Sequence, residues 1–154
     1  MIIIEGDLIQ LAQQGRFNAI VHGCNCFCCM GAGVAFQIQK YFPTAYLADQ
    51  ATIRGHKAKL GTCQFVEVSD TLTVVNAYTQ YGTGIGKQVN YDALRLCMQQ
   101  IKKTLGGKHI GMPLIGCGLA GGDWDVVSEI IQEELDFEDV TVVVLDWNCL
   151  KNPK

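Results

Sequence analysis

The alternation of apolar and polar positions along the chain predicts strands and helices in turn. Short runs rich in β-branched residues predict six strands: Ile2–Glu5, Ala19–His22, Cys63–Val68, Leu72–Tyr78, His109–Met112 and Val140–Leu145. Between them, apolar residues recur at helical spacing in five segments: Asp7–Gln14, Gly33–Phe42, Tyr46–Arg54, Tyr91–Leu105 and Trp124–Asp136. Several strands are apolar on both faces, which is typical of a sheet covered by helices on both sides. We therefore expect an α/β protein built as a three-layer α/β/α sandwich.

Two of these strands are close enough in sequence to pair directly. Cys63–Val68 and Leu72–Tyr78 are joined by a short polar turn around Ser69–Thr71, which favours an antiparallel hairpin. The central sheet is therefore expected to be mixed and not purely parallel. No repeat or proline-rich linker divides the 154 residues, of which 49% are hydrophobic, so the pattern predicts a single domain over residues 1–154.

Charge and hydropathy narrow the range of partners. The net charge is −3 and the 12 Lys and Arg residues are scattered, so no basic stripe exists to neutralise a run of nucleic-acid phosphates. The apolar run near the start of the chain is too short for a membrane span or a secretory signal. We expect a cytoplasmic monomer with no membrane partner and no sequence-specific nucleic-acid partner. The negative net charge is still compatible with a small anionic ligand, because backbone N–H groups at the start of a helix can hold phosphate without net positive charge.

The eight cysteines are expected to be reduced thiols, since the sequence suggests a cytosolic protein. Four of them form a cluster in one stretch: Cys24, Cys26, Cys28 and Cys29. Their spacing lacks the usual C-x2-4-C separation of zinc ligands, and no matching pair of His or Cys follows downstream. We therefore expect no metal, and we expect most of these thiols to be small packing residues.

Two glycine-rich loops, residues 22–35 and residues 113–124, lead from predicted strands into predicted helices. Glycines such as Gly31 and Gly33 let backbone approach a ligand closely at the start of a helix. Either loop alone is explained equally well as a tight turn. Two such loops at the carboxyl ends of strands in one sheet, however, present facing N–H donors that suit a diphosphate. Neither matches a Walker A motif or a dinucleotide fingerprint, which disfavours ATP hydrolysis and NAD-dependent hydride transfer, and we expect no cofactor.

The motifs in these loops carry a specific resemblance. The segments in question are Gly6-Asp7-Leu8, Ala19-Ile20-Val21-His22-Gly23-Cys24-Asn25, Met30-Gly31-Ala32-Gly33-Val34-Ala35 and Ile115-Gly116-Cys117-Gly118-Leu119. In this order they resemble the motif set of macrodomains across nearly the whole chain. The nearest resemblance is to the branch that contains terminal ADP-ribose protein glycohydrolases and fungal ADP-ribose-1''-phosphate phosphatases.

The resemblance implies a binding site for ADP-ribose or a close derivative, free or attached to a protein. Asp7 would accept from the adenine amino group, and the backbone of Leu8 would meet the ring edge. Asn25 would contact the distal ribose, and Trp147 would form a wall for adenine. The phosphates and the distal ribose would be held by two sets of residues: Gly31, Ala32, Gly33 and Val34 in the first loop, and Gly116, Cys117, Gly118, Leu119 and Ala120 in the second.

The residues alone leave other roles open for these side chains. Asp7 is also well placed to cap the helix that follows it. Asn25 is a common turn former, and Trp147 is equally well explained as a packing residue. The loop of residues 81–90 has three glycines at alternating positions. It would serve equally well as a mobile flap over the distal ribose or as a connection without function.

Macrodomains divide into hydrolases and plain binders, and the residues that divide them lie around the distal ribose. The glycohydrolase branch uses a lysine after the central hairpin and an aspartate directly after Gly-Cys-Gly-Leu. Here the second position is Ala120 and the hairpin ends in Thr79-Gln80-Tyr81. Lys87 and Asp123 would replace that pair only if their loops fold back into the site.

His22 matches the phosphatase pattern and is the single imidazole in a candidate loop. A histidine at the end of a buried strand is also often a satisfied core residue. The first hypothesis is therefore an enzyme that hydrolyses ADP-ribose 1''-phosphate, with His22 and Asn25 positioning water. The alternatives are a non-catalytic reader of ADP-ribose, and a hydrolase that removes ADP-ribose from glutamate, aspartate or a nucleobase through Asp123 or Lys87.

Overall fold

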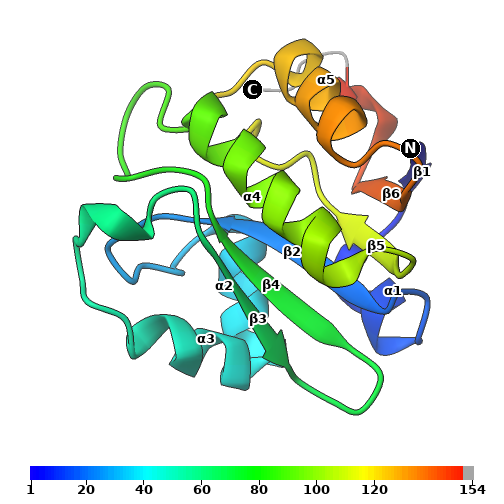
Figure 1. Ribbon diagram of the computed structural model, residues 1–154, viewed down its shortest axis with the longest axis horizontal. Coiled ribbons are helices and arrows are strands. Elements are labelled where there is room, and N and C mark those ends of the chain that lie inside the picture. Colours follow the sequence, from blue (N-terminus) through cyan, green and yellow to red (C-terminus); the bar gives the residue numbers. More distant parts are fainter. Residues whose placement is uncertain (151–154) are drawn as a thin grey trace.

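The structure is a computed structural model, and it describes residues 1–150 (Figure 1). In chain order its elements are β1 (Ile2–Glu5), α1 (Leu8–Gln13), β2 (Ala19–Cys24), α2 (Gly33–Tyr41), α3 (Pro43–Gln50), the short 3-10 helix η1 (Lys57–Lys59), β3 (Cys63–Glu67), β4 (Thr73–Tyr78), α4 (Tyr91–Leu105), β5 (His109–Met112), α5 (Trp124–Glu134), β6 (Asp139–Val144) and the 3-10 helix η2 (Trp147–Leu150). Each predicted strand and α-helix is therefore present near its expected position.

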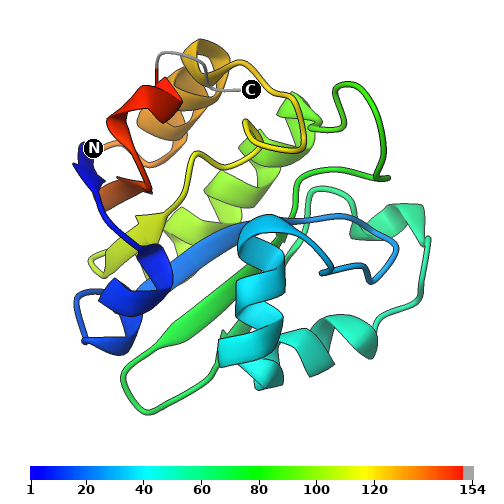
Figure 2. The ribbon, with the colours of Figure 1, turned by 180° about the vertical axis from the view of Figure 1, so that it is seen from behind.

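The strands form one mixed sheet in the order β1-β6-β5-β2-β4-β3. Neighbouring strands are parallel except for β3, which pairs with β4 in the predicted antiparallel hairpin. Helices α4 and α5 cover one face of the sheet in Figure 1, and α1, α2 and α3 cover the other face in Figure 2. The three-layer α/β/α sandwich and the mixed sheet are thus confirmed.

The two cores explain why the strands are apolar on both faces. Val74 and Val75 are consecutive residues of β4, and both are fully buried. Successive side chains of a strand point to opposite faces, so Val74 packs in the core beneath α1–α3 and Val75 in the core beneath α4 and α5. The hydrophobic effect therefore acts on both sides of the same strand, which fixes the register of the sheet.

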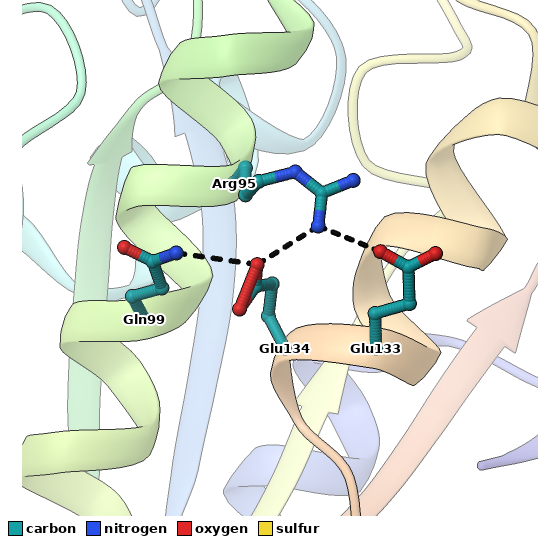
Figure 3. Close-up of polar contacts among 4 residues, drawn as sticks. All are labelled: Arg95, Gln99, Glu133 and Glu134. Atoms are coloured by element: carbon teal, nitrogen blue, oxygen red, sulfur yellow. Dashed lines mark hydrogen bonds and ion pairs between the residues drawn. The ribbon is translucent and has the colours of Figure 1, made fainter.

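Helices α4 and α5 are also linked at the surface (Figure 3). The guanidinium of Arg95 on α4 donates to Glu133 at 2.7 Å and to Glu134 at 2.8 Å, both on α5. The side-chain amide of Gln99 donates to the same Glu134 carboxylate. Arg95 and Glu133 are partly exposed to solvent, whereas Glu134 is mostly covered, so solvent screens part of the cluster and its contribution to stability is modest.

Two boundaries differ from those predicted. Helix α3 begins at Pro43, ahead of the expected Tyr46, because proline suits the first helical turn, where its missing N–H is not needed. The same helix ends at Gln50, and not at Arg54. Strand β2 continues beyond His22 to Cys24, because it keeps its pairing with β4 to the end of that strand. None of the helices within residues 1–150 is long and apolar enough to cross a membrane.

Candidate functional site

A cleft of about 980 Å³ lies at the carboxyl ends of the parallel strands. Its lining comes from residues 6–9 after β1, from the first glycine loop and the start of α2, from Gln80, Thr83, Gly84 and Gln88, from the second glycine loop, and from Val143, Val144, Leu145 and Cys149 around the end of β6. Among the described residues that line it, Asp7 is the single Asp, Glu, Lys or Arg. An anion in this cleft would therefore be held by backbone N–H groups and not by basic side chains.

The first glycine loop opens the start of α2 toward the cleft. Gly31, Ala32, Gly33 and Val34, which were expected to bind the ligand, all line it. Gly33 has a φ of 60°, in the left-handed region that favours glycine. Ala32 is the N-cap residue and has no side chain that could bond the first N–H groups of the helix. These donors and the positive end of the helix dipole are available to a ligand.

The second glycine loop contributes Gly116, Gly118, Leu119 and Ala120 to the lining. Gly116 has a φ of 75°, and a Cβ there would lie 2.8 Å from Val89. Cys117, which was also expected to bind the ligand, is fully buried in the core beneath α4 and α5 and does not line the cleft. Burial raises the pKa of its thiol to about 12, so it is protonated and unreactive at neutral pH.

Asp7 and Leu8 line the cleft at the end of β1. Asp7 is also the N-cap of α1, where its Oδ1 accepts from the backbone N–H of Gln10 at 3.0 Å. The capping role open from the sequence is therefore present. The carboxylate keeps its second oxygen for a donor in the cleft.

Asn25 lines the cleft, but its amide mainly shapes the first loop. Its Oδ1 accepts from the N–H groups of Phe27 and Cys29, and its Nδ2 donates to the carbonyl of Cys29 at 2.8 Å. Both acceptor positions are therefore occupied within the loop. One Nδ2 hydrogen remains to donate to a ligand.

His22 lies among the residues that line the cleft, and its imidazole is 1% exposed. Its Nε2 is 2.6 Å from Oδ1 of Asn76, whose Nδ2 donates to Ala45 and Gln64. Since Asn76 presents its oxygen, Nε2 must carry the proton and Nδ1 the lone pair. Burial lowers the pKa of His22 to about 4, against the opposing effect of the Asn76 hydrogen bond. The ring is therefore neutral at physiological pH.

Asp123 and Trp147 do not line the cleft. Asp123 caps α5, accepting from the N–H of Asp125 at 2.9 Å, while its own N–H donates to the hydroxyl of Tyr91. Trp147 is about half exposed in η2, and the residues that line the cleft in this segment are Leu145 and Cys149.

The loop of residues 81–90, called the flap loop below, is fixed against the second glycine loop. The N–H groups of Gln88 and Val89 both donate to the carbonyl of Ala120, at 2.8 and 3.2 Å. Thr83, Gly84 and Gln88 line the cleft, so this loop forms its wall near Ala120. Lys87 does not line the cleft; its ammonium lies 4.4 Å from the ring centroid of Tyr91.

Lys59 braces the first loop, a contact that sequence reasoning missed. Its ammonium donates to the carbonyl of Cys26 at 2.9 Å, to the hydroxyl of Thr52 at 2.7 Å and to the carbonyl of Ile53. The brace holds a segment in which Cys28 has an unfavourable φ of 58°. A lone lysine in a polar stretch carries no pattern that identifies such a contact. Within residues 1–150, no three His, Cys, Asp or Glu side chains converge to hold a metal ion.

Comparison with known proteins gives the family. The Macro domain model matches residues 21–131. A 17.5 kDa protein from the tk-vs intergenic region of Enterobacteria phage T4 is 35% identical over 155 residues, covering 96% of each chain. The ADP-ribose glycohydrolase OARD1 of Bos taurus is 28% identical, over 92% of this chain and 88% of that protein. The chain belongs to the macrodomain family.

A solved structure shows the same fold. The chain superimposes on Thermosipho africanus DarTG in complex with ADP-ribose with a TM-score of 0.71 and 20% identity, over 92% of this chain and 40% of that chain. At this identity the likeness concerns the fold alone. This chain is thus a macrodomain, and one of its relatives is named an ADP-ribose glycohydrolase.

Proposed function

We propose that this macrodomain binds ADP-ribose, or a derivative of it, in the cleft between the two glycine loops. The observation that carries the proposal is the chemistry of the lining: two loops of backbone donors, one helix start, and Asp7 as the single ionised side chain at the end near β1. A diphosphate needs several N–H donors, and an adenine amino group needs one good acceptor. The lining supplies both at separate places.

The motif order supports the placement of the ligand along the cleft. Adenine lies by Asp7 and Leu8, the diphosphate lies between the two glycine loops, and the distal ribose lies by Asn25 and Ala120. The OARD1 relative, named for its action on ADP-ribose, supports the same ligand class.

Isothermal titration with ADP-ribose tests this proposal, and we expect a dissociation constant in the micromolar range. The variant Asp7→Asn is expected to bind about tenfold more weakly, because an amide is a poorer acceptor than a carboxylate for the adenine amino group. Asparagine caps a helix as well as aspartate does, so the melting temperature should stay unchanged. Unchanged affinity in the variant would place adenine elsewhere, and no binding by the wild type would contradict the proposed ligand.

Hydrolysis of ADP-ribose 1''-phosphate is the second candidate function. What favours it is that His22 and Asn25 both line the same cleft as the glycine loops. At a pKa of about 4, His22 would act as a neutral hydrogen-bonding group and not as a general base poised near pH 7. Phosphate release by the wild type that is lost in His22→Gln and Asn25→Ala would support this function. Binding without phosphate release would identify a reader.

Removal of ADP-ribose from an amino-acid side chain or a nucleobase receives less support from the site. That route needs Lys87 or Asp123 at the distal ribose, and neither lines the cleft. Asp123 is committed to the start of α5, and Lys87 to the ring of Tyr91. We therefore do not assign them a step.

A further inference from the structure

A second cavity lies beside the cleft, behind the flap loop. It has a volume of about 580 Å³ and is formed by the two ends of the flap loop and the first turn of α4. Gln88 lines both this cavity and the main cleft. Gln88 therefore lies between the two spaces, next to the end of the cleft that the proposed function gives to the distal ribose.

The tip of the flap loop carries little side-chain bulk. Gly84 and Gly86 at the tip of the flap loop have φ values of 115° and 92°, and a Cβ at either would find no atom within 4 Å. The tip of the flap loop therefore presents no side chain at Gly84 or Gly86 that would obstruct a group attached to the distal ribose.

The second cavity contains the positive charge that the main cleft lacks. Lys87 lines it, with its ammonium 4.4 Å from the centroid of the Tyr91 ring. This cation–π contact keeps the ammonium at the cavity wall, and within residues 1–150 no carboxylate oxygen lies within 4.0 Å of it. Tyr91 belongs to the first turn of α4, a helix of 15 residues whose positive dipole end faces the same space.

Tyr81 also lines the cavity, and its ring is held in place. Its hydroxyl donates to the carbonyl of Gly55 at 2.8 Å, and its ring meets Phe27 edge-on at 4.9 Å. The ammonium of Lys57 lies 5.6 Å from the centroid of the same ring. The acidic side chain that lines the cavity is Asp92. Lys57 does not line the cavity, so Lys87 and Asp92 are its two charged lining residues within residues 1–150, and Lys87 is the one that attracts an anion.

We propose that the second cavity is a subsite for an anionic group carried by the distal ribose, a phosphate monoester, and that Lys87 is the cation that recognises it. The inference rests on the proposed binding of ADP-ribose in the main cleft and adds a specificity determinant to it. The main cleft holds the ADP-ribose part through backbone donors. Lys87 then distinguishes a ligand with a further phosphate from ADP-ribose itself.

The test compares the dissociation constants for ADP-ribose and for ADP-ribose 1''-phosphate, both measured by isothermal titration. If the protein releases phosphate from ADP-ribose 1''-phosphate, the KM from initial rates is used in place of the dissociation constant for that ligand. The wild type is expected to prefer the phosphorylated ligand. In Lys87→Gln that preference should fall about tenfold while the affinity for ADP-ribose stays the same. Asp92→Asn should increase the preference, because it removes the opposing carboxylate. Lys108→Gln, the same charge change at an exposed site outside both cavities, should have no effect.

Each outcome has a definite meaning. Equal affinity of the wild type for both ligands, or an equal preference in Lys87→Gln and Lys108→Gln, would overturn the subsite and leave ADP-ribose binding intact. If the wild type binds neither ligand, the proposed function fails, and the subsite fails with it. Opposite shifts in Lys87→Gln and Asp92→Asn would support the subsite, since a general loss of folding cannot produce them.

Discussion

Replacing Gly118 by glutamate is expected to lower the affinity for ADP-ribose by about a hundredfold or more while leaving the fold intact. Gly118 lines the cleft, a Cβ there would have no atom within 4 Å, and its φ lies outside the left-handed region. The new side chain fits, but it carries a charge into the proposed diphosphate site. Like charges about 4 Å apart repel by roughly 4 kcal/mol at an effective dielectric constant of about 20. Isothermal titration measures the loss, and thermal melting checks the fold.

Two matched variants show whether the loss of affinity comes from a charge at this position, from the size of the new side chain, or from the change in the protein's net charge. Gly118→Gln adds a side chain of the same size without the charge, so it should keep far more affinity than the glutamate variant. Gln132→Glu adds the same charge on the exposed side of α5, away from the cleft, and should bind like the wild type. Equal losses in the two Gly118 variants would mean that size alone blocks the site. Full affinity in Gly118→Glu would show that the diphosphate does not lie beside this loop.

The fold followed from the sequence because its determinants are local. The apolar runs of β2 and β4 and the helical spacing of α4 are each readable within about fifteen residues. The hairpin between β3 and β4 could be predicted from the short polar turn that joins the two strands. The boundary errors arose where the deciding contact was not in the local pattern, as at Pro43, which starts α3 earlier than its apolar residues suggest.

The glycine loops could be identified from the sequence for the same reason. The sequence did not show which residues of each loop face the cleft and which face the core. Gly118 faces the cleft and Cys117 faces the core, although they are adjacent and both belong to the motif. The path of the turn decides between them, and that path depends on the left-handed φ of Gly116 and on Val89, which leaves no room for a Cβ at that position. Asp123 was likewise a candidate catalytic residue from the sequence, but in the structure its carboxylate caps the start of α5.

Contacts between segments that are far apart in the chain could not be predicted from the sequence. Lys59 braces the first loop from η1, more than thirty positions along the chain from Cys26. The second cavity needed the flap loop and the start of α4 to be placed together, and no composition signal marks it. Residues such as Leu145, Cys149 and Gln88 were missed because apolar or amide side chains in a loop have no distinguishing pattern.

The environment of His22 was also decided by distant partners, and it has a measurable consequence for stability. In the folded protein the pKa of His22 is lowered from 6.5 to about 4 by burial. As the pH falls below 6.5, the unfolded chain therefore takes up a proton that the folded chain resists, which favours unfolding. The stabilising contribution is complete above pH 6.5 and is lost as the pH falls toward 4, by an amount on the order of 3 kcal/mol. Urea unfolding between pH 7.5 and pH 4.5 or so measures it.

The variant His22→Gln isolates this contribution, because it keeps a donor for Asn76 but does not titrate. Asp49, whose pKa is raised chiefly by burial, acts in the opposite direction, since the folded chain takes up its proton first on acidification. Asp49 is present in both proteins, so its effect cancels in the difference between them. The wild type should be the more stable protein at pH 7.5 or so, and the difference should shrink as the pH falls toward 4.5. A difference that stays constant with pH would mean that His22 is protonated alike in the folded and unfolded chains, and so that its imidazole is open to solvent.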